Sequence, residues 1–362
     1  MRRILIAGGG TGGHLMPALA IAEALRRMAP DIEPVLVGAV RGVEARLLPT
    51  RSFRYHLLPS EPIYRRTWWR NARWPILAGR LLRDVARLFA AEQPVAVLGT
   101  GGYASAPVVW WAARQGIPTA VQEQNAYPGL ATRWLSRRVR HVYLGLPEAR
   151  RLLRFGAKTE VFETGNPIVP PSPERRRAAL ARFGLDGQRP VVLVTGGSQG
   201  ALAINRAVAG WLDGGGPAGA DLLWVTGRAT HAEFAARQRA PAVQVIDFLD
   251  PMADGYAVAD LVVSRAGMIT VAELCAWGLP SVLVPLPTAA ADHQTHNARV
   301  LADAGASALL PQSDLSSGRL GETVDALLED HGRLRAMAAL ALARGRPDAA
   351  ADIVSRLLTL PR

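Results

Sequence analysis

The sequence of 362 residues is poor in cysteine and lysine, and it lacks long apolar runs. Cys275 is the only cysteine, which excludes an internal disulfide and fits a reducing compartment. No uncharged apolar run reaches the roughly 18 residues that a membrane-spanning helix needs. The chain starts with the strand-like residues 3–7, so we expect no signal peptide. The 7 histidines are scattered and no Cys/His or Asp-x-Asp cluster stands out, so we expect neither a metal site nor a cofactor.

Positive charge, in contrast, is in excess. The chain carries 42 basic and 30 acidic residues, a formal net charge of +12, and every basic residue except Lys158 is an arginine. This balance favours an anionic partner such as phosphate, an acidic lipid or nucleic acid. No recognised nucleic-acid-binding module is present, so we expect no nucleic-acid partner.

Continuous apolar runs alternate with helix-like segments along most of the chain. Such runs are typical of parallel strands that are buried on both faces, and the alternation predicts an α/β protein with ligands at the carboxyl ends of its strands. The pattern restarts after the proline-rich residues 165–173, which read as a linker. We therefore expect two Rossmann-like domains that face one cleft, over residues 1–166 and 167–345, followed by a final helix near 346–362.

The first motif is the glycine-rich turn Gly8-Gly9-Gly10-Thr11-Gly12-Gly13, followed by His14. Glycines let a ligand approach the backbone, and N–H groups at a helix start attract anions. A dinucleotide site would also need an acid at the end of the second strand to bind ribose, but Val37-Gly38 stands there and Glu44 comes too late. We therefore discount an NAD site. His14 is either a base beside the turn or a structural, helix-capping histidine.

The second motif is Gly196-Gly197-Ser198-Gln199-Gly200, after a strand in the second half. It matches the G-x-S-x-G nucleophile elbow of serine hydrolases, for which Asp247 or Asp250 and His293 could complete a triad. A hydrolase leaves the first glycine-rich turn and the doubled pattern unexplained. We therefore favour a diphosphate bound by Ser198 and the turn amides, with a tight turn that binds nothing as the remaining alternative.

The third motif runs from Ser264 to Glu273, where a strand, a glycine turn and a helix follow one another. Thr270 can cap this helix, with Glu273 at the capping-box position. Alternatively, the Glu273 carboxylate accepts hydrogen bonds from the two vicinal hydroxyls of a ribose. Both roles can hold together.

Polar residues also follow two further strands of the first half, at 99–103 and 122–125. At these positions of a parallel sheet, side chains normally line the ligand site. Glu123 is therefore either a catalytic base or an exposed loop carboxylate.

The segment between Tyr64 and Phe89 combines arginine and tryptophan. It holds seven arginines and one acid, Asp84. Aromatic rings at headgroup level beside cations are typical of a surface that binds an anionic membrane, with Trp110-Trp111 as a further candidate. The alternative is an ordinary amphipathic helix, with Arg80, Arg83 and Arg87 on one face and Leu81, Val85 and Leu88 on another. The predicted membrane patch comprises Trp68, Trp69, Arg70, Arg73, Trp74, Ile76 and Leu77.

In their order along the chain, these motifs resemble the MurG family of glycosyltransferases. The matching segments are 8–20, 101–103, 123–125, 165–167, 196–200, 265–273 and 293–298, so the resemblance covers nearly the whole chain. Members of this family convert lipid I into lipid II in peptidoglycan synthesis. The resemblance implies a GT-B fold, with two Rossmann-like domains, and a final helix that returns to the first domain.

The resemblance also implies roles for individual residues. On the second domain, Leu249 would flank uracil, Glu273 would hold the ribose and Gln294 the sugar hydroxyls. The full donor set would be Thr11, Gly12, Gly13, Asn125, Ser198, Leu249, Met268, Ile269, Thr270, Val271, Ala272, Glu273 and Gln294. The acceptor set would be His14, Gly101, Gly102, Tyr103 and Glu123. The family usually has an arginine where this chain has Val169, so one donor contact is missing or comes from another arginine, such as Arg265.

The reaction implied is inverting transfer of N-acetylglucosamine (GlcNAc) from UDP-GlcNAc to the 4-hydroxyl of N-acetylmuramic acid in lipid I. His14 is the candidate general base. The resemblance places the protein peripherally at the cytoplasmic face of the bacterial inner membrane, in cell-wall synthesis and hence in cell shape and division. Other possibilities are a different UDP-sugar transferase with a lipid acceptor, a nucleotide-sugar-binding protein without catalysis, and a hydrolase that uses Ser198.

Overall fold

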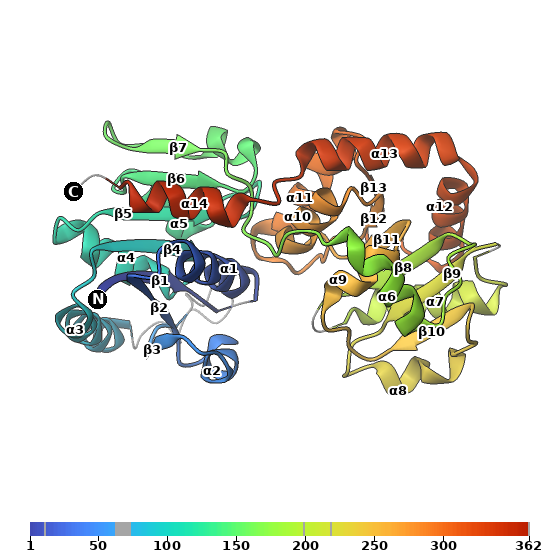
Figure 1. Cartoon of the computed structure of the whole chain (residues 1–362), viewed down its shortest axis with the longest axis horizontal. Helices are drawn as coiled ribbons and strands as arrows, with labels where there is room; N and C mark the ends of the chain where they lie inside the picture. The colour runs from blue at the N-terminus through green and yellow to red at the C-terminus, as the bar shows by residue number, and fades with distance from the viewer. Residues whose placement is uncertain (11, 62–73, 198–199, 218, 361–362) are drawn as a thin grey trace. The chain divides into compact units, whose positions relative to one another are not determined.

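The computed structural model describes residues 1–10, 12–61, 74–197, 200–217 and 219–360. The chain divides into two compact units (Figure 1). The first comprises Met1–Val169 together with Asp348–Arg362, and the second comprises Pro170–Pro347. In the described part of the chain no helix is both long and apolar enough to cross a membrane.

Each unit is built on one parallel sheet, as the continuous apolar runs predict. The first sheet has the order β3-β2-β1-β4-β5-β6-β7 and the second the order β10-β9-β8-β11-β12-β13. The strands of the first are β1 (Arg2–Gly8), β2 (Ile32–Ala39), β3 (Arg54–Leu58), β4 (Ala96–Gly101), β5 (Thr119–Glu123), β6 (His141–Leu144) and β7 (Glu160–Phe162). Those of the second are β8 (Val191–Thr195), β9 (Asp221–Val225), β10 (Val243–Ile246), β11 (Leu261–Ser264), β12 (Ser281–Leu283) and β13 (Ser307–Leu309).

Helices connect and cover these strands. The first unit contains α1 (Gly12–Met28), α2 (Glu44–Leu47), α3 (Trp74–Glu92), α4 (Ser105–Arg114), α5 (Leu130–Leu135) and α14 (Ala349–Leu358). The second contains α6 (Arg176–Phe183), α7 (Leu202–Asp213), α8 (His231–Phe234), α9 (Met252–Val258), α10 (Met268–Trp277), α11 (His293–Asp303), α12 (Ser317–Glu329) and α13 (His331–Arg344). Short 3-10 helices lie at Leu48–Thr50, Pro147–Leu152, Pro173–Arg175, Ala235–Arg237 and Ala290–Asp292.

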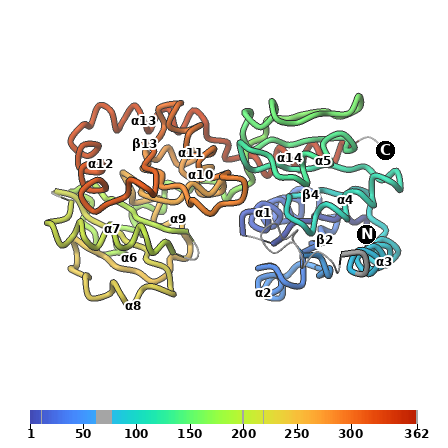
Figure 2. Tube along the Cα trace, turned by 180° about the vertical axis from the view of Figure 1, so that it is seen from behind, coloured from blue at the N-terminus to red at the C-terminus, as the bar shows by residue number. Residues whose placement is uncertain are grey.

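The alternation of side chains along β1 explains why both faces of the first sheet are covered. Ile4 and Ile6 pack with α1 and α14 on one face, whereas Leu5 and Ala7 pack with α3 and α4 on the other. Figure 1 shows the face with α1 and α14, and Figure 2 shows the unit from behind. Because successive side chains of a strand point to opposite faces, an unbroken apolar run needs cover on both sides.

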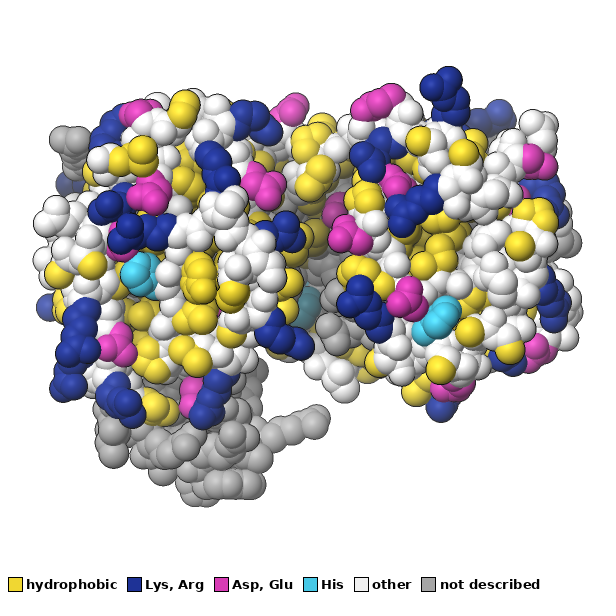
Figure 3. Space-filling view, turned by 60° about the horizontal axis from the view of Figure 1, so that its bottom comes forward, with side chains coloured by type: hydrophobic (Ala, Val, Ile, Leu, Met, Phe, Trp, Pro, Cys, Tyr) yellow, Lys and Arg dark blue, Asp and Glu magenta, His cyan; other side chains and the backbone are white. Residues whose placement is uncertain are grey.

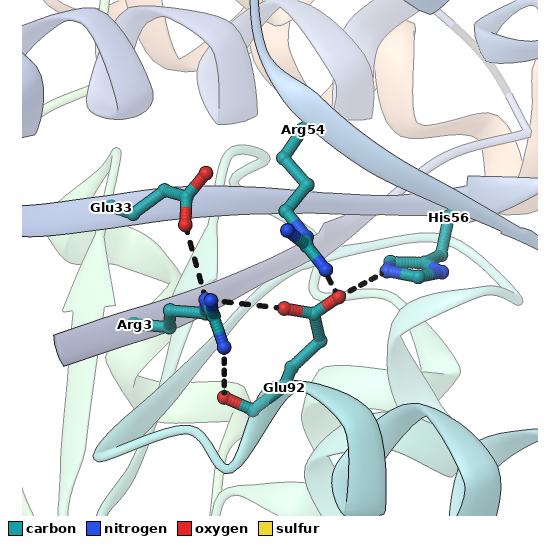
Figure 4. Close-up of polar contacts among 5 residues, drawn as sticks. All are labelled: Arg3, Glu33, Arg54, His56 and Glu92. Atoms are coloured by element: carbon teal, nitrogen blue, oxygen red, sulfur yellow. Dashed lines mark hydrogen bonds and ion pairs between the residues drawn. The ribbon is translucent and has the colours of Figure 1, made fainter. Parts of the chain in front are cut away.

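A cluster of charged residues ties the end of α3 to the amino-terminal ends of the strands (Figure 4). The buried Glu92 carboxylate accepts hydrogen bonds from Arg54 Nε at 2.8 Å and lies 2.6 Å from His56 Nε2. Arg3 Nε lies 3.4 Å from the same carboxylate and 3.0 Å from Glu33. Burial raises the pKa of Glu92, but the hydrogen bonds from His56 and Arg54 outweigh it, and the net pKa is lowered. The carboxylate is therefore held in its charged form at the edge of the sheet opposite the glycine-rich turns.

The described part of α3 is amphipathic, as its spacing predicts. Arg80, Arg83 and Arg87 are exposed, whereas Leu81 and Val85 are buried in the core. Of the predicted membrane patch, Trp68, Trp69, Arg70 and Arg73 lie outside the described residues, as do the side chains of Trp74 and Ile76; Leu77 is half-buried. Trp110 and Trp111 are half-buried against the core of the first unit.

Surface charge is mixed on the face shown in Figure 3. There, arginine side chains lie among acidic and apolar ones on both units rather than in one continuous basic area. On this face the excess positive charge is therefore dispersed.

Candidate functional site

The glycine-rich turn after β1 packs directly against the turn after β4. Gly9 N–H donates to Gly101 O at 3.4 Å, and a Cβ on Gly102 would lie 1.8 Å from Gly9 O. Gly102 also has a φ of +78°, which favours glycine. The Tyr103 ring lies against Gly10, where an added Cβ would be 2.5 Å from it. The sequence placed these two turns at the carboxyl ends of strands, and the structure brings them into contact.

The buried side chain of Glu44 holds the first glycine-rich turn through hydrogen bonds. Both oxygens of the Glu44 carboxylate accept the Gly10 N–H, at 2.8 and 3.0 Å, and one also accepts the Ala39 N–H at 2.8 Å. Gly9 and Gly38 leave room for the Glu44 side chain, because a Cβ added to Gly9 would lie 2.1 Å from it and a Cβ added to Gly38 would lie 2.4 Å from it. In the sequence, Glu44 lies too far beyond the second strand to be a ribose ligand. Its carboxylate instead holds the turn, a role whose sequence signal is a lone acid among glycines.

His14, two residues into α1, lies at the centre of this site. Its Nδ1 is 3.2 Å from Gln124 Oε1, and its carbonyl accepts the Thr100 hydroxyl at 2.9 Å. A Cβ added to Gly101 would be 2.7 Å from His14 Nδ1, so the glycine leaves room for the ring. Ahead of it, Gly12 and Gly13 are exposed at the start of α1, and Thr11 lies outside the described residues.

Glu123 is buried rather than exposed on a loop. One carboxylate oxygen accepts the backbone N–H and the side-chain amide of Asn125, at 3.1 and 3.2 Å. The other accepts the Gly129 N–H at 3.0 Å. The expectation of an exposed carboxylate is therefore wrong, and the side chain stabilises its own loop. A contact of Glu123 with an acceptor stays a prediction.

In the second unit, the turn after β8 packs against the end of β9. A Cβ on Gly200 would lie 2.4 Å from Thr226 O, and Gly200 has a φ of +73°. Ser198 lies outside the described residues. Two of the other candidates for the hypothetical triad have separate partners: His293 Nδ1 is 2.8 Å from Ala290 O, and Asp247 is 4.0 Å from Arg228.

The helix α10 starts without a side-chain cap. It begins at Met268 with Gly267 as its N-cap residue, and the first bond runs from Val271 N–H to Gly267 O at 2.9 Å. The prediction that Thr270 caps the helix is therefore wrong, because the helix starts two residues earlier. The N–H groups of Met268, Ile269 and Thr270 accordingly have no partner within the helix, which is the arrangement that favours an anion.

Glu273 is bound by a tyrosine that the sequence analysis did not find. The buried Tyr256 hydroxyl, on α9, donates to Glu273 Oε2 at 2.9 Å. Burial raises the pKa of the Glu273 carboxyl to about 7, although the hydrogen bond from Tyr256 acts in the opposite direction. Gly255, which precedes Tyr256, leaves room for Leu249, since a Cβ added to this glycine would lie 2.7 Å from the Leu249 side chain. The short helix α9 thus contacts both Leu249 and Glu273.

Further side chains of the second unit hold the loops around α10. The Arg265 guanidinium donates to the Val284 and Pro285 carbonyls, both at 3.1 Å, and to Gln312 at 2.7 Å. Arg265 is therefore engaged in structure and is a poor substitute for the arginine missing at Val169, which is exposed. Gln294 Oε1 accepts the Leu286 N–H at 3.0 Å, which orients its amide nitrogen away from this contact.

Two parallel α/β units with glycine-rich turns after their first strands define the class: GT-B glycosyltransferases. A family model described as glycosyltransferase family 28 N-terminal domain matches residues 4–144, and one described as glycosyltransferase family 28 C-terminal domain matches residues 191–353. The chain belongs to glycosyltransferase family 28.

Relatives align over the full length of the chain. The chain is 40% identical to the UDP-N-acetylglucosamine–N-acetylmuramyl-(pentapeptide) pyrophosphoryl-undecaprenol N-acetylglucosamine transferase of Chlorobaculum parvum, covering 99% of this chain and 100% of that one. It is 41% identical to the protein of the same name from Chlorobium luteolum, covering 99% and 98%. The crystal structure of MurG from Acinetobacter baumannii superposes with a TM-score of 0.78 at 28% identity, covering 99% of each chain. The resemblance to the MurG family is thus confirmed.

Proposed function

We propose that this protein transfers GlcNAc from UDP-GlcNAc to the 4-hydroxyl of N-acetylmuramic acid in lipid I, and so forms lipid II. The observation that carries the proposal is the 40% identity to a transferase of that name over the full length of both chains. The local geometry supports it. One unit presents a histidine between two glycine turns, and the other presents an uncapped helix start beside a partly buried carboxyl.

His14 acts as the general base in the first unit. The acceptor hydroxyl attacks the anomeric carbon on the side opposite UDP, and His14 takes its proton. The two glycine turns, with Gly101, Gly102 and Tyr103, bind the acceptor. Glu44 already accepts the Gly10 N–H, so an acceptor diphosphate would bind at the exposed Gly12 and Gly13 rather than at Gly10.

The second unit binds the donor and stabilises the leaving group. As the glycosidic bond breaks, negative charge grows on UDP, and the N–H groups at the start of α10 are oriented to stabilise it. Met268–Ala272 line the diphosphate and nucleoside, together with Ser198. Glu273 accepts hydrogen bonds from the ribose hydroxyls, Leu249 flanks uracil, and Gln294 binds sugar hydroxyls. Gly12, Gly13, Thr11 and Asn125 complete the donor set.

Membrane attachment is peripheral and lies at the cytoplasmic face in this proposal. The arginines exposed on α3 support it, because cations near anionic headgroups are each worth about 1 kcal/mol. Trp68, Trp69, Arg70, Arg73, Trp74, Ile76 and Leu77 form the attachment surface. Binding to vesicles with and without anionic lipid tests this part separately from catalysis.

The deciding experiment measures UDP release from UDP-GlcNAc with and without a lipid I analogue, in EDTA. Release that depends on the acceptor supports the transferase. Release without acceptor means hydrolysis and contradicts it, and tight UDP binding without release points to a different acceptor. His14→Ala should lower kcat by about 100-fold or more, since a general base contributes that much. His331→Ala, at an exposed position in α13, is the matched control.

A further inference from the structure

The orientation of one buried amide near His14 follows from its partners. Gln124 Nε2 lies 2.6 Å from Thr100 O and 2.5 Å from Gln122 Oε1. A backbone carbonyl only accepts hydrogen bonds, so the amide nitrogen of Gln124 must face Thr100. Its oxygen consequently faces the other way, towards the His14 ring at 3.2 Å.

Two further amides continue the chain in the same direction. Gln122 Nε2 donates to Asn166 Oδ1 at 2.9 Å, and Asn166 Nδ2 donates to the Gln124 carbonyl at 3.1 Å. All three side chains are buried. Gly145 leaves room for Asn166, because an added Cβ would lie 2.3 Å from its oxygen. Reversing any one of these amides would place two donors or two acceptors face to face, which is costly in a buried site.

These hydrogen-bonded amides determine which nitrogen of the His14 ring carries the proton. An amide oxygen accepts only, so the ring atom that faces it, Nδ1, carries the proton. In the neutral ring the lone pair then lies on Nε2. The Thr100 hydroxyl binds the His14 carbonyl at 2.9 Å, so the backbone of His14 is held by the same residue that orients Gln124.

We propose that Gln124, oriented by Thr100, Gln122 and Asn166, is a positioning residue that sets the tautomer of His14 and directs Nε2 to the acceptor hydroxyl. The inference rests on the proposed role of His14 as general base. Gln124 touches no substrate in this account. It acts through the imidazole, as an orienting group acts on a catalytic histidine in other enzymes.

The tautomer can be read directly by ¹⁵N NMR of the histidine rings in the intact protein, without substrate. We expect His14, assigned by its loss in His14→Ala, to show a protonated Nδ1 and an unprotonated Nε2. In Gln124→Met, whose thioether sulfur is only a weak acceptor, a mixture of tautomers should appear. A protonated Nε2 in the wild type, or an unchanged tautomer in Gln124→Met, would overturn the inference.

Kinetics supply the second readout. Gln124→Met should lower kcat at least about tenfold with little change in KM for UDP-GlcNAc, because only the base is affected. Adding Gln124→Met to His14→Ala should cost nothing more. Wild-type activity in His14→Ala would refute the proposed base, whereas the NMR result would still decide the role of Gln124. Should Gln124→Met fold poorly by circular dichroism, Gln122→Met weakens the same chain one step further away.

Discussion

Glu273 shows how burial tunes one side chain for ligand binding. Its carboxyl lies against Tyr256, and burial raises its pKa to about 7. Among the described residues, Tyr256 is the titratable group that acts on Glu273. Near neutral pH the carboxyl is therefore divided between its two forms.

A pH dependence of donor binding follows if Glu273 holds the ribose. The ionised carboxylate accepts hydroxyl hydrogen bonds more strongly than the neutral acid. KM for UDP-GlcNAc should therefore rise as pH falls through about 7, by roughly tenfold between the two limits. Tyr256→Phe removes the bond that lowers the pKa, so the rise should begin at higher pH. Initial rates from pH 5.5 to 8.5 measure both. Glu273→Gln serves as the reference. A wild-type KM for UDP-GlcNAc that does not change with pH would contradict the prediction.

The positions of some site residues can be predicted from the sequence and those of others cannot. The sequence places His14, Gly101 and Gly102 beside strand ends, because glycine turns after apolar strands are a local signal. Tyr256 was not found, since its partner lies 17 positions along the chain on a different helix. The contacts of Arg265 are hidden from the sequence for the same reason, because its carbonyl partners follow β12 and do not appear in the local pattern.

At the scale of elements, the turn after β1 depends on the short helix α2. This helix starts at Glu44, which binds Gly10 and Ala39 through a fully buried carboxylate. A buried acceptor that serves two backbone donors is costly to remove, because both N–H groups would lose their partners. The element therefore contributes to the first glycine turn although it contains no part of the predicted motif.

Removing this carboxylate should destabilise the turn and the unit. Glu44→Ala should lower the free energy of unfolding by about 2–4 kcal/mol, and Glu44→Gln by less, since an amide oxygen can still accept. The KM for the lipid I analogue should rise as the turn is destabilised. Urea unfolding measures the stability effect. Glu23→Ala, at an exposed site on α1, should change it by under about 0.5 kcal/mol. An equal loss of unfolding free energy in Glu44→Ala and Glu23→Ala would contradict the structural role of the Glu44 carboxylate.

The sequence indicates the buried strands and the edge strand β10, but not the other strands at the sheet edges. The central strands β1, β4, β8 and β11 appear as continuous apolar runs. The edge strand β3 reads Arg-Tyr-His-Leu-Leu and is partly exposed, so it lacks that signal. The short strands β7 and β13, at the ends of the two sheets, lack this signal likewise. An edge strand has one neighbour and is half open to solvent, so its composition is mixed.

On the scale of the whole molecule, the last helix belongs to the first unit. The chain leaves the second unit after Pro347, and α14 packs against α1. Ile353, Val354 and Leu357 are buried there with core residues of α1 and β1. The first unit therefore cannot complete its core until the end of the chain is available.

Removing an apolar side chain from the contact between α14 and α1 should lower the stability of the first unit selectively. Leu357→Ala removes a side chain that is 2% exposed and should cost about 2–4 kcal/mol. Its neighbour Leu358 is 40% exposed, so Leu358→Ala should cost under about 1 kcal/mol. Hydrogen exchange resolved by segment measures the two effects. Faster exchange in residues 170–347 than in 1–169 for Leu357→Ala would contradict the assignment of α14 to the first unit.

The sequence by itself determined the parallel α/β class, the doubled pattern and the family, because apolar periodicity and glycine turns are local properties of the chain. Only the tertiary structure decided which carboxylates are structural and which amide faces His14. Glu44 meets Gly10 across 34 positions and Gln124 meets His14 across 110. Hydrogen bonds over such separations depend on how strands are ordered and helices packed, and burial then makes each unpaired group costly enough to define one arrangement.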